Sequence, residues 1–160
     1  MLVKFFPQLT YLFGVRLQNK PLPYEDNITR HLIDRWVPQH HKRRRETLIV
    51  YDFVKKNCSI ATVRWYENTT LSFFTPSLFF DHIFMYGIYD VNEIMFLKSI
   101  LRKGDVFVDA GANCGMYTIF ASKIVGKAGR VFAFEPSTRE YKFLLLNIHQ
   151  NKCNNVRAYN

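Results

Sequence analysis

The sequence predicts an α/β protein whose carboxyl-terminal part is the first βαβαβ half of a doubly wound, mononucleotide-binding fold. Three short apolar runs, residues 105–109, 130–134 and 156–159, have the composition of strands buried on both faces of a parallel sheet. Two stretches with apolar residues at helical spacing, residues 116–125 and the stretch that follows Ser137, separate these runs. Strands and helices therefore alternate within one short segment, as in a βαβαβ unit.

The helices of this segment carry their own start and stop signals. Ser137 followed by Glu140 is a capping-box pair, in which each side chain satisfies a free amide of the first helical turn. A further helix is predicted ahead of the first strand, over residues 92–101, and Lys103-Gly104 ends it because glycine tolerates the left-handed cap conformation. The apolar residues expected on one face of that helix are Ile94, Leu97, Ile100 and Leu101.

The upstream half is irregular, with scattered prolines and aromatic residues. Runs rich in strand formers occupy residues 47–53, 60–66 and 70–74, and residues 67–68 between the last two are typical of a turn. We expect a small antiparallel meander there. The chain thus divides into a β-rich N-terminal region, residues 1–85, and the βαβαβ segment, residues 86–160.

Composition restricts the partners and the compartment. The formal charge of +9 suggests a polyanion, but the densest basic run, residues 42–45, lies outside the βαβαβ segment, so we expect a solvated basic surface, with nucleic acid as the less favoured partner. The three cysteines form no CxxC pair, which is typical of free thiols in a reducing compartment, and no histidine or cysteine spacing suits a metal. No apolar run approaches the roughly 20 residues of a bilayer span and no signal peptide is recognisable, so a cytoplasmic protein without a transmembrane segment is expected.

The candidate site is the turn that follows the first strand, residues 109–115. Ligands of open parallel sheets bind beyond the carboxyl ends of the strands. Gly111 removes a side chain where backbone approaches a ligand, and Gly115 allows close packing of the incoming helix, whose free amides would receive a ligand carboxylate. Glu135 ends the second strand at an offset typical of an acidic residue that accepts hydrogen bonds from ribose hydroxyls.

The charges of the turn indicate which nucleoside it binds. The turn has the spacing Gly-x-x-x-Gly rather than the dinucleotide fingerprint, and Asp109 precedes it. A carboxylate at that position repels a pyrophosphate but attracts ammonium and sulfonium groups, by roughly 4 kcal/mol for charges about 4 Å apart at an effective dielectric near 20. S-adenosylmethionine carries those cations, a ribose and a carboxylate, so it is preferred over NAD.

These motifs resemble FkbM-family methyltransferases. Residues 104–118, GDVFVDAGANCGMYT, look like the first motif of the family, and residues 129–137, GRVFAFEPS, are similar to its second signature. The lead-in at residues 87–93 also matches, and the resemblance covers roughly residues 86 to 160. It implies a Rossmann-like class I fold and S-adenosylmethionine-dependent methyl transfer, usually to a hydroxyl on a sugar or small natural product.

The resemblance also implies roles for particular residues. Asp109, Gly111, Asn113 and Gly115 would hold the methionine portion, Glu135 the ribose, and Tyr117 and Thr118 would lie near the methionine carboxylate, although helix packing explains Tyr117 equally well. Glu93 is a weaker candidate, and Cys114 is expected only to fill space. The full set of expected cofactor-binding residues is Asp109, Gly111, Ala112, Asn113, Gly115, Tyr117, Thr118, Glu135, Pro136 and Ser137.

Length is the departure from the family. A complete domain of this type needs about four further strands, whose loops carry acceptor-binding and base residues, so the chain is expected to be a fragment with an open sheet edge that an oligomer or a partner chain covers. Its acceptor is expected to be a small-molecule or glycan hydroxyl. The alternatives are a shortened protein that binds cofactor or a partner without catalysis, and a nucleic-acid methyltransferase.

Overall fold

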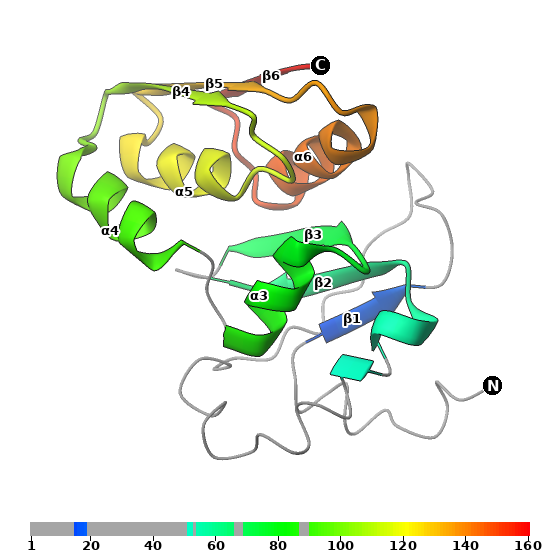
Figure 1. The fold of residues 1–160 in the computed structure, drawn as a ribbon. Helices are drawn as coiled ribbons and strands as arrows, with labels where there is room; N and C mark the ends of the chain where they lie inside the picture. Colours follow the sequence, from blue (N-terminus) through cyan, green and yellow to red (C-terminus); the bar gives the residue numbers. More distant parts are fainter. Residues whose placement is uncertain (1–14, 19–50, 53, 66–68, 87–89) are drawn as a thin grey trace. The chain divides into compact units, whose positions relative to one another are not determined.

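The computed structural model describes residues 15–18, 51–52, 54–65, 69–86 and 90–160 (Figure 1). The chain divides into two compact units, the first formed by Met1–Trp65 and Phe73–Tyr89 and the second by Tyr66–Ser72 and Asp90–Asn160. Each unit is described by itself below. None of the helices in the described ranges is long and apolar enough to cross a membrane.

The second unit contains the predicted βαβαβ arrangement. Its three parallel strands, β4 (Val106–Ala110), β5 (Arg130–Phe134) and β6 (Val156–Tyr159), pair in the order β4-β5-β6. Helix α5 (Met116–Val125) joins β4 to β5, and α6 (Thr138–Gln150) joins β5 to β6. The prediction of this α/β topology is confirmed, and each strand begins within one residue of its predicted start.

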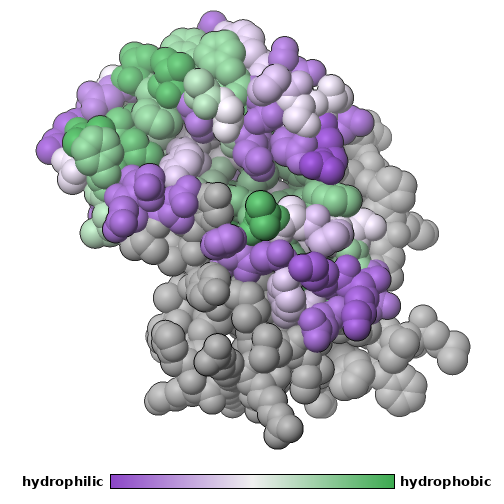
Figure 2. Space-filling view, viewed as in Figure 1, coloured by the Kyte–Doolittle hydropathy of each residue, from purple (hydrophilic) through white to green (hydrophobic). Residues whose placement is uncertain are grey.

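One face of this sheet is apolar but uncovered, and here the prediction of strands buried on both faces is wrong. Val131 and Ala133 of β5 are fully buried, whereas Val106 and Val108 of β4 are 64% and 59% exposed. The reason is that α5 and α6 lie on the same side of the sheet, as Figure 1 shows. Figure 2 shows apolar surface at the upper edge of the view, where Figure 1 draws β4 and β5.

Helix α4 (Val91–Ile100) precedes the sheet and contacts α5. Ile94, Leu97 and Leu101 are buried as predicted, but Ile100 is 48% exposed, so its predicted position on the buried face is wrong. At about 100° per residue, Ile100 lies roughly 120° around the helix axis from Ile94. Leu101 has left the helix with an extended backbone, which lets its side chain reach the core instead.

The start of α6 differs from the predicted capping box. The Ser137 hydroxyl donates to Glu140 Oε2 at 2.5 Å, rather than accepting a bond from a helix amide. The Ser137 amide donates to Glu135 Oε1 at 2.8 Å, so Glu135 takes the place predicted for Glu140. Arg139 also pairs with Glu140, and this ion pair is the main reason that the pKa of the Glu140 carboxyl is lowered.

The first unit is built from β1 (Val15–Gln18), β2 (Ile60–Arg64) and the end of β3 (Thr70–Phe74), in the strand order β1-β2-β3, and from α3 (Leu78–Tyr86). Strands β1 and β2 are antiparallel, with Val15 opposite Val63. The strands predicted within residues 60–66 and 70–74 are confirmed. The turn predicted at residues 67–68 and the basic run at residues 42–45 lie outside the described residues.

The strand predicted over residues 47–53 is wrong where the structure describes it, because Tyr51, Asp52 and residues 54–57 are helical, and β1 joins β2 instead. A contact one helical turn apart favours the helix, because Lys55 Nζ donates to Tyr51 Oη at 2.8 Å, and the Tyr51 ring also stacks on Phe80 of α3. Val54 is fully buried. Packing against neighbours therefore outweighs the strand propensity of the run, which is a weak preference by itself.

Candidate functional site at the ends of β4 and β5

The carboxyl ends of β4 and β5 bring two buried carboxylates to one edge of the sheet. Asp109 lies opposite Ala133 in the parallel register, and Glu135 directly follows β5. Each of the two acidic residues is only 7% exposed. Their charges interact, since the negative charge of Glu135 contributes to raising the pKa of Asp109. The predicted placement of both acids at a common strand edge is what the structure shows.

The turn between β4 and α5 uses three residues with left-handed backbone, Gly111 at φ 83°, Asn113 at φ 52° and Gly115 at φ 89°. All five amides of residues 111–115 donate to acceptors within the unit. The acceptors are Phe134 O for Gly111 and Ala112, Glu135 Oε2 for Asn113, Asn113 Oδ1 for Cys114, and Ala112 O for Gly115. Hydrogen bonds within the turn and to Phe134 and Glu135 therefore fix its backbone. All five amides are occupied, so they offer no donor to an anionic ligand.

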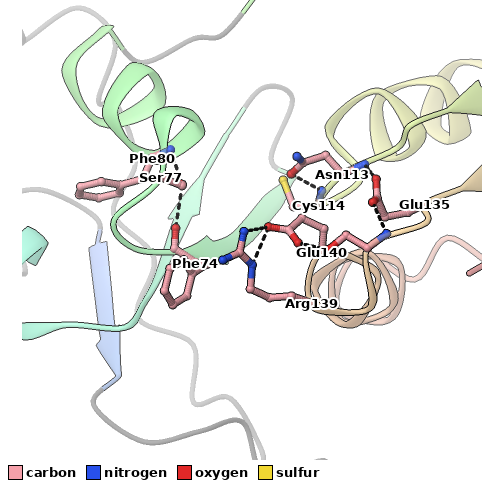
Figure 3. A network of polar contacts seen from close by, with 9 residues as sticks. Phe74, Ser77, Phe80, Asn113, Cys114, Glu135, Arg139 and Glu140 are labelled. Carbon is pink, nitrogen blue, oxygen red and sulfur yellow. Dashed lines mark hydrogen bonds and ion pairs between the residues drawn. The ribbon is translucent and has the colours of Figure 1, made fainter.

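Glu135 joins the turn to the start of α6. Its Oε2 accepts the Asn113 amide at 2.7 Å and its Oε1 accepts the Ser137 amide at 2.8 Å, as Figure 3 shows for the contact with Asn113. A carboxylate has about four lone-pair positions. The two amides hold the side chain in one orientation, and about two acceptor positions are left for donors of a ligand, which is the number that a vicinal diol supplies.

Asp109 is bonded to the first turn of α5. The Thr118 hydroxyl donates to Asp109 Oδ2 at 2.5 Å, and Thr118 is itself fully buried. Burial raises the pKa of Asp109 and the charge of Glu135 raises it further, while hydrogen bonds from the Thr118 hydroxyl and amide lower it. Thr118 lies in the first turn of α5, so this hydrogen bond ties the end of β4 to the start of the helix.

Tyr117, two residues into α5, is directed to the segment that leads into α4. Its hydroxyl donates to Asp90 Oδ2 at 2.7 Å, and Asp90 has a left-handed backbone at φ 50°. The structure therefore gives Tyr117 a partner on this lead-in segment. Glu93, the weaker candidate, is an exposed residue in the first turn of α4.

The remaining predicted residues follow the same edge. Gly111, Asn113, Pro136 and Ser137 are exposed, and Ala112 is buried against Ala133 and Leu144. Cys114 is buried, and burial raises the pKa of its thiol to about 12, which leaves it un-ionised at neutral pH and fits the expected space-filling role. Among the described residues, no group of histidine, cysteine and acidic side chains is arranged to hold a metal.

Sequence reasoning missed two buried polar residues behind the turn. Asn147 of α6 and Asn151, the residue that follows α6, are both buried and make hydrogen bonds through their side chains. A signal was present, because each position lies three residues, about one helical turn, after an apolar residue of the buried stripe, Leu144 or Ile148. A polar side chain on the buried face of a helix needs a partner, which makes such positions candidates for structural or functional contacts.

Comparison with known proteins supports the fold. No family model and no curated sequence matches the chain. Among solved structures, M. jannaschii TYW2 in complex with AdoMet is similar over 62% of this chain and 42% of its own, with 24% identity and a TM-score of 0.51. A putative transferase from Pyrococcus horikoshii is similar over 77% of this chain and 48% of its own, with 19% identity and a TM-score of 0.51.

The second unit has the Rossmann-like fold that these proteins share. A SAM dependent methyltransferase from Aquifex aeolicus also matches, over 49% of this chain and 40% of its own, at 20% identity and a TM-score of 0.40. The chain spans less than half the length of each of these three structures.

Proposed function

We propose that this protein is an S-adenosylmethionine-dependent methyltransferase of the FkbM type, which transfers a methyl group to a hydroxyl of a sugar or small metabolite. One observation carries the proposal: two buried carboxylates, Asp109 and Glu135, flank a turn whose amides are all bonded internally. Such a site offers acceptors rather than donors. It therefore suits a ligand that carries positive charge and hydroxyls, and it does not suit a pyrophosphate.

Each part of S-adenosylmethionine fits one part of this edge. The ribose hydroxyls suit the acceptor positions of Glu135 that its two amide contacts leave. The ammonium and sulfonium charges suit the negative potential near Asp109. The methionine carboxylate needs amide donors outside residues 111–115, and the dipole at the start of α5 attracts it. The solved structure of M. jannaschii TYW2 in complex with AdoMet supports a cofactor of this class on this fold.

When bound, the cofactor supplies an electrophilic methyl group on sulfonium. The residues of this chain would contribute binding and orientation, with Glu135 orienting the nucleoside and Asp109 attracting the positive charge of the methionine end. Holding two reactants in line supplies a large part of the acceleration of a bimolecular displacement. The general base for the acceptor hydroxyl and the acceptor-binding residues are not assigned to any residue of this chain.

The proposal is tested by calorimetric titration of the full chain with S-adenosylmethionine. Glu135→Gln keeps the size of the side chain but removes its charge and one acceptor oxygen. Bonds to a charged acceptor contribute about 1.5–3 kcal/mol, so affinity should fall about tenfold or more. Asp52→Asn, an acid-to-amide change at an exposed residue of the first unit, is the control and should bind as the wild type does.

The outcomes separate the candidates. If the wild type takes up no S-adenosylmethionine, or if Glu135→Gln binds it as well as the wild type, the cofactor assignment is wrong. If the cofactor binds but no small hydroxyl acceptor is methylated, an RNA acceptor is the next candidate, which the formal charge of +9 favours. Binding without transfer to either class of acceptor would favour a cofactor-binding protein without catalysis.

A further inference from the structure

The side chains of α6 form an edge that pairs with an extended backbone. Asn147 Oδ1 accepts the Ser72 amide at 2.7 Å, and its Nδ2 donates to Ser72 O at 2.8 Å. Four residues later, at the C-cap of α6, Asn151 repeats this arrangement: its Oδ1 accepts the Thr70 amide at 2.8 Å, and its Nδ2 donates to Thr70 O at 2.6 Å. Each asparagine thus replaces the neighbouring strand that a β-ladder would supply.

The spacing of helix and strand makes this pairing regular. Four residues of an α-helix rise about 6 Å, and two residues of a strand rise about 6.6 Å. The distance from position 147 to the C-cap at 151 therefore matches the distance from position 72 to position 70 of the strand. Gln150 strengthens the pairing, because its Nε2 donates to Thr70 O at 2.9 Å and its Oε1 accepts the Ser72 hydroxyl at 3.3 Å.

Asn147 has one more contact, and this contact is with the candidate site. Its Nδ2 also donates to Cys114 O at 2.6 Å, and its Oδ1 also accepts Gln150 Nε2 at 2.5 Å. All four hydrogen-bonding positions of the fully buried amide are then occupied. Cys114 O belongs to the peptide bond between Cys114 and Gly115, at the end of the turn where α5 begins.

Leu144, one turn earlier on α6, contacts the same peptide. A Cβ added at Gly115 would lie 2.6 Å from Leu144 Cδ1, so the two backbones are in close approach. Leu144 and Asn147 therefore hold Gly115 and Cys114 from the same face of α6, one by packing and one by a hydrogen bond. The orientation of this peptide sets the direction in which α5 starts and closes the turn that Asp109 and Glu135 flank.

We propose that Asn147 is a positioning residue for cofactor binding, and that it couples the strand at Thr70–Ser72 to the turn at residues 111–115. The inference rests on the proposed S-adenosylmethionine site. The strand lies about 40 residues upstream of the turn in the sequence, yet one amide group bonds to both. Ligand binding that stiffens the turn must then also stabilise the pairing of Ser72 with α6.

Asn147→Ala and Asn151→Ala form a matched pair for the test. Both variants remove one two-bond contact with the strand, but only Asn147 contacts Cys114 O. Since an unsatisfied buried carbonyl weakens the turn, S-adenosylmethionine should bind about tenfold more weakly to Asn147→Ala at matched folded fraction, and within about threefold of wild type to Asn151→Ala. Equal losses of affinity in the two variants would overturn the proposal.

Hydrogen exchange supplies a readout that does not depend on ligand. The Gly115 and Ile119 amides, which bond to Ala112 O and Gly115 O, should exchange faster in Asn147→Ala than in Asn151→Ala. If Asn147→Ala does not fold, the same measurement on the wild type tests the coupling. Addition of S-adenosylmethionine should then slow exchange of the Ser72 amide as well as the Gly115 amide. Slower exchange at Gly115 with no change at Ser72 would refute the coupling, whereas absence of binding to the wild type would refute the cofactor assignment instead.

Discussion

Three glycines with left-handed backbone offer a controlled test of the turn. Gly104, Gly111 and Gly115 have φ of 92°, 83° and 89°, so alanine is strained at each position. Their surroundings differ. A Cβ at Gly104 or Gly111 meets nothing within 4 Å, whereas a Cβ at Gly115 lies 2.6 Å from Leu144 Cδ1. Replacing each with alanine therefore separates backbone strain from steric contact.

The structure sets the size of the expected losses. Left-handed backbone costs an alanine about 1–2 kcal/mol, and this applies to all three variants. Alanine also lowers the entropy of the unfolded chain, which offsets about 0.4–1 kcal/mol equally in the three. Gly115→Ala adds the overpacking of Leu144, a fully buried side chain, at about 1–3 kcal/mol. Gly115→Ala should therefore be less stable than Gly104→Ala by about that last amount.

Urea denaturation measures the three free energies of unfolding, and a second substitution checks the cause. In a Leu144→Ala background the extra loss from Gly115→Ala should disappear, because the contacting methyl group is gone. Titration with S-adenosylmethionine then adds the functional comparison, in which Gly111→Ala should weaken binding and Gly104→Ala should not. Equal stability of Gly115→Ala and Gly104→Ala would show that α6 does not press on the turn.

Two further predictions concern charge and exposed surface. Because the folded pKa of Asp109 is raised, the native state binds more protons than the unfolded state between the unfolded and folded pKa values, so stability should fall as pH rises through that window. The denaturation midpoint, measured as a function of pH, should show this decline in the wild type and not in Asp109→Asn. Identical profiles for the two proteins would contradict a raised pKa of Asp109. The uncovered sheet face around Val108 and Phe134 should cause self-association of the full chain, measurable by sedimentation velocity. Val108→Lys should reduce it without changing cofactor affinity, and a monomeric wild type would contradict this prediction.

The order of elements in the second unit was predictable because each signal is local. Short apolar runs, helical periodicity and glycines mark boundaries through interactions within a few residues, and β5 and β6 occupy the residues that the pattern indicated. Burial was not predictable in the same way. Val106 and Val108 are apolar enough for a covered strand, but their exposure depends on which side of the sheet the helices take. The exposure of a strand face is therefore a property of the folded unit and cannot be read from the apolar segment alone.

The same distinction applies to the candidate site. The positions of Asp109 and Glu135 follow from strand ends in a parallel sheet, and sequence alone predicts them. The hydrogen-bond partners of these acids could not be predicted from the sequence. Glu135 accepts one amide from the turn after β4 and one from the start of α6, and Asp109 accepts the hydroxyl of Thr118. Asn147 was missed for a related reason, because its partners Ser72 and Cys114 are far from it in the sequence.

The two buried acids at the strand edge, taken together, support the proposed binding of a cationic ligand. Burial is the main reason that the pKa of Asp109 is raised, and the charge of Glu135 raises it further, so a charged Asp109 is unfavourable in the free protein. Hydrogen bonds from Thr118 lower this pKa but offset only part of the combined effect of burial and the Glu135 charge. In the proposed complex, the positive charge of the ligand beside Asp109 would favour its ionised form and offset this cost. Buried acids with raised pKa values are common at binding sites, and we expect Asp109 to contribute to cofactor binding for this reason.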